Sequence, residues 1–256
     1  METLMPRFFI RKDQIEDNII TLTGDDAHHV ARSLRMAVGE EITVCDMQAN
    51  EYTCRISGFE DDARVFAEIL SAKVSETEPR CRITLFQALS KGDKLDTVIQ
   101  KAVECGAFEI IPFESERCVV RVKEDAEERK TERRRRISAE AAKQCGRSIV
   151  PNVRPTVCFD EMLELAKQSE LALFCYEGDG TVPLGRVLSE RLVAREDGSY
   201  PSVSVVIGSE GGFSLAEAAQ AKDAGLVPVG LGKRILRTET APVFVLSCLV
   251  CTSELG

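Results

Sequence analysis

Tryptophan is absent from the 256-residue sequence, and aromatic residues make up only 5% of it, so the core must be mainly aliphatic. The first residues, METLMPRFFIRKDQ, have no long apolar stretch behind a basic one, and we therefore expect no secretion signal. The most apolar window, APVFVLSCLVC (241–251), is too short to span a bilayer. These absences predict a cytoplasmic protein with no membrane partner.

Histidine is scarce as well, because the sequence contains only His28 and His29. The ten cysteines are scattered singly through apolar segments, which is typical of reduced, buried side chains in the cytosol. The one close pair, Cys248 and Cys251, has no second cysteine pair to complete a four-coordinate zinc site. We expect core packing for these cysteines and no metal.

Positive charge is in deficit, since 33 Lys and Arg face 42 Asp and Glu and leave a net charge of −9. This balance as a whole disfavours a nucleic-acid partner. Basic residues nevertheless cluster at 7–12, 31–35, 90–94 and, in RKTERRRR, 129–136. Such patches can hold a phosphate backbone. The arginine run alone fits a solvated helix face equally well, because four successive arginines spread around a helix.

Two kinds of hydrophobic pattern divide the chain. Up to about residue 75, short apolar or alternating runs at 7–10, 18–22, 40–46, 51–57 and 64–70 predict strands of a small barrel or sandwich, with a helix around 25–34. From residue 82, strands at 82–89, 108–113, 171–176, 202–208 and 226–231 alternate with helices at 93–106, 123–145 and 241–251. That alternation predicts an α/β domain with a mainly parallel sheet and helices on both faces.

Two glycine-bearing loops follow the last two strands. IGSEGGFS (207–214) precedes a helix that Ser214 and Glu217 begin as a capping box, and GLGKRILRTETAP (230–242) precedes the final helix. Both loops lie at carboxyl ends of predicted parallel strands, where ligands bind in open sheets, so we expect one site. Neither a dinucleotide fingerprint nor a P-loop is present, which disfavours a nucleotide-dependent oxidoreductase. A carboxylate at Glu210 suits a neutral or cationic ligand, such as an adenosine sulfonium. The alternative is that the glycines serve a tight turn and that Glu210 is a capping residue.

With IGSEGGFS and LGKRILRTETA, the sequence resembles the RsmE family of ribosomal RNA methyltransferases in the SPOUT superfamily. The segments SKGDKLDTVIQKAVECGAFEIIPF, AEAAKQCGRSIVPNV, MPRFFI and DDAHHVARSLRMAVGEEITVCD extend this resemblance over nearly the whole chain. It implies a PUA-like RNA-binding β-barrel at 1–74 and a SPOUT methyltransferase domain at 75–256 with a C-terminal trefoil knot. It also implies S-adenosylmethionine as cofactor, a homodimer, and N3-methyluridine in 16S rRNA of the small ribosomal subunit as product.

The resemblance also assigns site residues. The implied cofactor-binding residues are Ile207, Gly208, Glu210, Gly211, Gly212, Leu231, Gly232, Ile235, Leu236, Arg237, Thr238, Thr240 and Ala241. The implied RNA-binding residues are Arg7, Arg32, Arg35, Lys91, Lys94, Gln144 and Arg147.

Methyl transfer from a sulfonium needs mainly the positioning of two partners, and good orientation can lower the barrier by roughly 7–11 kcal/mol. We assign Arg237 as the catalytic residue that stabilises an anionic uracil, and Glu210 as a base or orienting group. Glu239 orders the loop in this interpretation. The alternative for Arg237 is a structural salt bridge to Glu239 or Glu210. The alternative for the whole protein is a non-catalytic ribosomal RNA-binding factor.

Overall fold

The computed structural model describes residues 5–60, 63–122 and 124–255. The chain forms two compact units: Met1–Glu78 with Ala142–Val150, and Pro79–Ala141 with Pro151–Gly256. The first unit therefore takes in residues 75–78 and 142–150 besides the expected 1–74. No helix within the described residues is long and apolar enough to cross a membrane.

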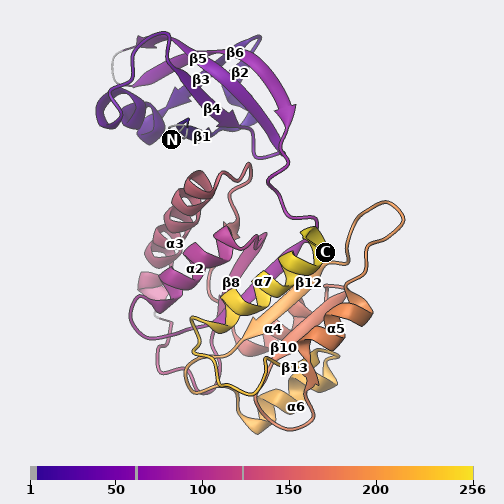
Figure 1. Ribbon diagram of the computed structural model, residues 1–256. Helices are drawn as coiled ribbons and strands as arrows, with labels where there is room; N and C mark the ends of the chain where they lie inside the picture. The colour runs from indigo at the N-terminus through magenta and orange to yellow at the C-terminus, as the bar shows by residue number, and fades with distance from the viewer. Residues whose placement is uncertain (1–4, 61–62, 123, 256) are drawn as a thin grey trace. The chain divides into compact units, whose positions relative to one another are not determined.

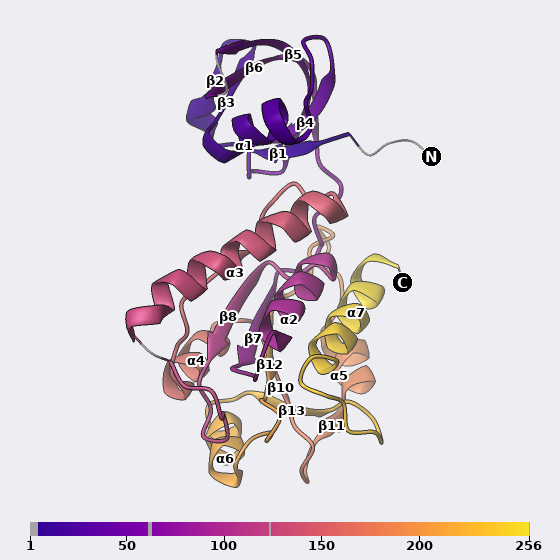
Figure 2. The ribbon, with the colours of Figure 1, turned by 90° about the vertical axis from the view of Figure 1, so that its left-hand side faces the viewer.

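The first unit is built on one six-stranded sheet that curls around its core (Figure 2). Its strands run in the order β1-β4-β5-β6-β3-β2, with β1 and β4 parallel and the other neighbours antiparallel. Their bounds are β1 (Arg7–Phe9), β2 (Ile15–Glu16), β3 (Ile19–Thr23), β4 (Glu41–Cys45), β5 (Asn50–Glu60) and β6 (Arg64–Val74). All five strands expected in this region are confirmed, and β2 is an additional one.

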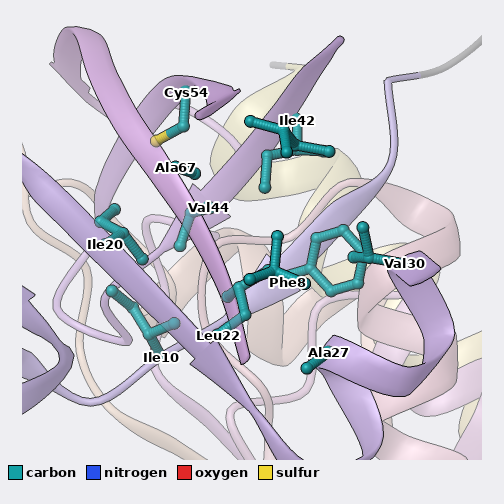
Figure 3. Close-up of a cluster of buried hydrophobic side chains, with 12 residues drawn as sticks. Phe8, Ile10, Ile20, Leu22, Ala27, Val30, Ile42, Val44, Cys54 and Ala67 are labelled. Carbon is teal, nitrogen blue, oxygen red and sulfur yellow. The ribbon is translucent and has the colours of Figure 1, made fainter. Parts of the chain in front are cut away.

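A short helical segment closes this core. The helix expected around 25–34 consists of α1 (Gly24–His28) and a π-helical turn, η2 (His29–Ser33), and a 3-10 turn, η1 (Lys12–Gln14), precedes β2. Ala27 and Val30 from this segment are fully buried against Phe8 and Leu22 of the sheet (Figure 3). The core is therefore mainly aliphatic, as the composition predicts.

The second unit contains a seven-stranded sheet in the order β11-β13-β10-β12-β7-β8-β9, and every pair in it is parallel. The strands are β7 (Ile83–Ala88), β8 (Glu109–Phe113), β9 (Asn152–Val153), β10 (Leu171–Cys175), β11 (Val182–Pro183), β12 (Val203–Ile207) and β13 (Val227–Gly230). All residues of the central strand β12 are buried, and Val205 lies opposite Leu173 on one side and Leu85 on the other. The predicted parallel α/β sheet is confirmed.

Helices cover both faces of this sheet, as expected (Figures 1 and 2). α2 (Lys94–Glu104), α5 (Leu184–Arg191) and α7 (Ala241–Glu254) lie on one face, and α4 (Phe159–Ala166) and α6 (Leu215–Asp223) lie on the other. α3 (Glu124–Cys145) is held beside β9, where the Ser138 hydroxyl donates to the Pro151 carbonyl at 2.7 Å. The expected start of α3 at residue 123 lies outside the described residues. β9, β11, α4 and α5 are elements that the sequence did not predict.

Candidate active site

A cavity of about 890 Å³ opens at the carboxyl ends of β10, β12 and β13. Most of its wall comes from residues 175–178, 207–213 and 230–239. Lys94 of α2, Arg117 of the β8–α3 loop, Thr181, Leu215 and Ala241 also line it. All of the predicted cofactor-binding residues except Thr240 line this cavity. Thr240 is instead the residue that precedes α7. The structure thus brings the two glycine-bearing loops together.

The glycine loop after β12 folds back on itself. The Gly212 N–H donates to the Ser209 carbonyl at 2.9 Å, and Gly212 has a φ of +64° that favours glycine. A Cβ on Gly208 would lie 3.0 Å from the Phe213 ring and 3.3 Å from the Cα of Gly212. The small side chains of this loop therefore permit a tight turn at the mouth of the cavity.

The end of the same loop is anchored in the core. The Phe213 ring is buried and its centroid lies 4.3 Å from that of Phe174. Directly afterwards, Ser214 and Glu217 form the predicted capping box at the start of α6. Glu217 also accepts a hydrogen bond from the Glu116 N–H at 2.7 Å, so the β8–α3 loop is fixed to the same helix start.

The segment before α7 is tied to two earlier segments through Thr238. Its hydroxyl donates to the Gly208 carbonyl at 2.7 Å and accepts from the side-chain amide of Gln87 at 3.0 Å. Gln87 lies in β7 and is fully buried. The two walls of the cavity are therefore joined to each other and to the centre of the sheet.

Lys94 joins two carboxylates at the edge of the cavity. Its Nζ lies 2.9 Å from Glu210 Oε1 and 3.7 Å from Glu239 Oε2. The Lys91 N–H also donates to Glu210 Oε1, at 3.2 Å. Burial alone would raise the pKa of Glu210, but the hydrogen bonds from Lys94 and from main-chain N–H groups outweigh it and lower that pKa. Glu210 is thus a paired, ionised carboxylate and a weak proton acceptor.

Arg237 projects into the cavity without an ion-pair partner among the described residues. Glu210 and Glu239, the partners considered from the sequence, face Lys94 instead. The salt bridge that would have made Arg237 purely structural is therefore not formed in this structure. Its guanidinium keeps its donors for a ligand.

The predicted RNA-binding residues differ in their exposure. In the first unit, Arg32, Arg35 and Gln144 are exposed. Arg7 is 13% exposed and pairs with Glu51 at 2.9 Å, whereas Arg147 is 4% exposed and pairs with Glu78 at 2.7 Å. In the second unit, Lys91 is exposed and Lys94 is paired as described above. The ion pairs give Arg7, Lys94 and Arg147 structural roles, and their RNA contacts stay predictions.

The arginine run in α3 does not form one uniform surface. Arg134 is buried and pairs with Glu127 at 3.2 Å, while Arg133 pairs with Asp96 of α2. Arg135 donates to the Val153 carbonyl at 3.0 Å. Several of these arginines therefore hold α3 in place.

Two parts of the cavity wall were missed from the sequence. Residues 175–178 follow β10 in LALFCYEGDG, a predicted strand with a glycine-bearing loop at its carboxyl end, and that pattern could have pointed to them. Arg117 donates to the Gly211 carbonyl at 3.1 Å from the β8–α3 loop, and no local pattern indicates this contact. Among the described residues, no group of three or more His, Cys, Asp or Glu is placed to hold a metal ion.

Comparison with known proteins identifies the chain as an RNA methyltransferase. The family model for an RNA methyltransferase domain matches residues 77–250, and that for an RNA methyltransferase PUA domain matches residues 22–70. The chain is 33% identical to ribosomal RNA small subunit methyltransferase E of Bacillus subtilis (strain 168), over 98% of each chain. It is 30% identical to the protein of that name from Mesomycoplasma hyopneumoniae (strain 232), over 95% of this chain and 98% of the relative.

A solved structure agrees with these relatives. Ribosomal RNA small subunit methyltransferase E from Neisseria gonorrhoeae, bound to S-adenosyl methionine, superimposes with a TM-score of 0.81 at 32% identity, covering 96% of each chain. The chain therefore belongs to the family of ribosomal RNA small subunit methyltransferase E, and the resemblance found in its motifs is confirmed.

Proposed function

We propose that this protein methylates N3 of a uridine in the 16S rRNA of the small ribosomal subunit, with S-adenosylmethionine as the methyl donor. The observation that carries the proposal is the cavity between the glycine-bearing segments after β12 and β13, in a chain that matches its family over nearly its whole length. The relative from Neisseria gonorrhoeae, which binds S-adenosyl methionine, supports the choice of cofactor.

The cavity fits such a cofactor. A volume of about 890 Å³ lies in the range of small-molecule sites. A Cβ built on Gly212 or Gly232 would meet no atom within 4 Å, so open space lies beside bare main chain at both positions. We assign binding to main-chain N–H and C=O groups of residues 207–212 and 231–241. When bound there, S-adenosylmethionine supplies a methyl group that its sulfonium charge has already activated.

The side chains around the cavity then position and polarise the uracil. The Arg237 guanidinium donates hydrogen bonds to a uracil carbonyl oxygen and stabilises the negative charge that forms as N3 loses its proton. Glu210 orients Lys94 and connects the glycine loop to the start of α2, as its two hydrogen bonds at 2.9 and 3.2 Å indicate. Its lowered pKa favours this orienting role over the role of base.

We assign RNA binding to the PUA-like unit, residues 1–74, and methyl transfer to residues 75–256. Exposed cations such as Arg32 and Arg35 contact phosphates, which position the RNA without reading its sequence. Recognition therefore depends on the shape of the ribosomal element. Because ribosomal RNA is the substrate, we place the protein in the cytoplasm.

The path of the last segment is also part of this proposal. We infer that residues 231–255 complete a trefoil knot. Thr238 supports this path, because it is hydrogen-bonded on one side to β7 and on the other to the loop after β12. A crystal structure that traces these residues tests it directly.

A homodimer formed through α7 completes the proposed assembly. Phe244 and Leu255 are 40% and 80% exposed, and Cys248 and Cys251 lie between them at helical spacing. An apolar stripe of this kind on the outside of a helix favours a second copy of the chain as its cover.

The decisive experiment uses small subunits from a strain that lacks this methyltransferase. We expect the protein and S-adenosylmethionine to add one methyl group, which nucleoside mass spectrometry identifies as 3-methyluridine in 16S rRNA. A protein that binds the subunits but neither methylates them nor binds S-adenosylmethionine in calorimetry would instead be a non-catalytic RNA-binding factor. The glycine-bearing cavity argues against that alternative.

A further inference from the structure

Unpaired buried oxygens gather around the candidate active site. Among the described residues, four buried side-chain atoms have no hydrogen-bond partner: Gln87 Oε1, Ser90 Oγ, Ser209 Oγ and Glu239 Oε2. They belong to the end of β7 and the residues after it, to the glycine loop, and to the segment before α7. Buried polar atoms are usually paired, so a cluster of exceptions calls for a functional explanation.

Glu239 is the ionisable member of this group. Its side chain lines the cavity and is 25% exposed. The distance of 3.7 Å between its Oε2 and Lys94 Nζ permits an ion pair but exceeds a hydrogen bond. Glu210 differs, because one of its oxygens accepts hydrogen bonds from both Lys94 and the Lys91 N–H. Of these two carboxylates, Glu239 is the one with an oxygen that accepts no hydrogen bond among the described residues.

The proposed reaction requires such an acceptor. Uracil N3 carries a proton and becomes a nucleophile when it loses it. A general base must lie in the cavity, be ionised and have a free acceptor atom. Arg237, two residues before Glu239, stabilises the resulting anion but cannot take the proton, because its guanidinium stays charged.

We propose that Glu239 is the general base of the methyl transfer. The inference rests on the proposed function and adds the group that removes the proton. The N3 proton passes to the Glu239 carboxylate, and the freed N3 electron pair forms the bond to the methyl carbon. The electron pair of the broken carbon–sulfur bond stays on sulfur, so charge and atoms balance.

Charged groups from several elements surround this carboxylate. Its own segment carries Lys233, Arg234 and Arg237, and the other elements around the cavity contribute Lys94, Arg117, Glu177 and Glu210. Lys94 forms an ion pair with Glu239 and is shared with Glu210. The pH dependence of turnover by the wild-type protein therefore has to be compared with that of variants at both carboxylates.

The test measures single-turnover methylation of unmodified small subunits by Glu239→Gln across a pH series, together with the affinity for S-adenosylmethionine. We expect a loss of about 100-fold to 10,000-fold near neutral pH, which is the usual value of general-base catalysis. The loss should shrink as pH rises, because uracil N3 then ionises without help. Calorimetry should find wild-type affinity for S-adenosylmethionine.

Two further variants distinguish a general base from an orienting carboxylate. Glu239→Asp keeps a carboxylate and should recover part of the neutral-pH activity. Glu210→Gln should lower turnover by the same factor at every pH. Wild-type turnover by Glu239→Gln at neutral pH, a loss that is equal at all pH values, or a loss explained by weaker S-adenosylmethionine binding would overturn the assignment. A wild-type protein that forms no 3-methyluridine overturns the proposed function, and the base with it.

Discussion

The hydroxyl of Thr238 lies 2.7 Å from the carbonyl oxygen of Gly208, and this hydrogen bond joins the two glycine-bearing walls of the cavity. The same hydroxyl accepts from Gln87, whose side chain is fully buried. One small side chain therefore fixes the distance between the two segments to which we assign cofactor binding.

Thr238→Val should remove both hydrogen bonds while it keeps the shape of the side chain. The buried Gln87 amide and the Gly208 carbonyl then lose partners, which costs about 1–3 kcal/mol of unfolding free energy. We expect urea denaturation to detect this loss and calorimetry to show weaker S-adenosylmethionine binding. Thr238→Ser keeps the hydroxyl and is the matched control. A valine variant with wild-type stability and affinity would show that the two walls hold together without this contact.

Arg237→Ala should abolish methylation while S-adenosylmethionine still binds. The guanidinium is exposed in the cavity and has no ion-pair partner among the described residues, so its removal leaves no carboxylate unpaired. Rapid-quench methylation and calorimetry separate the two effects. Arg237→Lys keeps the charge without the planar fork of donors and should recover a small part of the rate. Normal turnover in the alanine variant would refute a catalytic role.

Local patterns predicted much of this molecule. Apolar runs identified the strands β7, β8, β10, β12 and β13, and the Ser214–Glu217 capping box marked the start of α6. The position of the two glycine-bearing loops after predicted parallel strands placed them in one site. Each of these patterns is contained in a short stretch of the sequence.

Contacts between distant residues could not be predicted in this way. Arg7 pairs with Glu51 across 44 positions and Arg147 with Glu78 across 69, so sequence alone showed them as free surface cations. Short elements such as β9 and β11, with two residues each, carry too little pattern to be recognised. Their pairing depends on the longer strands beside them.

Arg147→Met should destabilise the first unit, since it leaves the half-buried Glu78 carboxylate without its cation. Removing one partner of a buried ion pair costs about 3–5 kcal/mol. Burial raises the pKa of Glu78, but hydrogen bonds from Arg147, Ser148 and Ile149 outweigh it and hold that pKa below its ordinary value of 4.5. A lowered carboxyl pKa stabilises the fold above pH 4.5 and loses this effect as pH falls through the folded value.

The difference in unfolding free energy between wild type and Arg147→Met should therefore be largest near neutral pH and shrink in acid. Urea denaturation at a series of pH values measures it. Arg64→Met is the control. It removes the cation of an exposed ion pair with Glu60 and should change the free energy of unfolding little. A stable Arg147→Met protein with reduced affinity for small subunits would instead favour the RNA contact predicted from the sequence.

Arg35→Ala should weaken binding to small subunits and make it less sensitive to salt. Each phosphate contact releases counterions, so losing one reduces the slope of log affinity against log salt by about one. Filter binding over a salt series measures this slope. Arg64→Ala removes the same charge from the same unit, at a residue that pairs with Glu60, and should leave the slope unchanged. Equal effects of both variants would indicate a general charge effect and no contact at Arg35.

Phe244→Glu should prevent the proposed homodimer from forming. The Phe244 side chain is 40% exposed at the start of the apolar stripe on α7, so a second copy would bury it, and a carboxylate there would lose its hydration on association. Light scattering coupled to gel filtration should report a dimer for wild type and a monomer for the variant. Ser57→Glu introduces the same charge at an exposed position of β5, outside α7, and should leave the oligomeric state unchanged. If wild type itself elutes as a monomer at micromolar concentration, or if Phe244→Glu remains dimeric, another surface must account for any assembly.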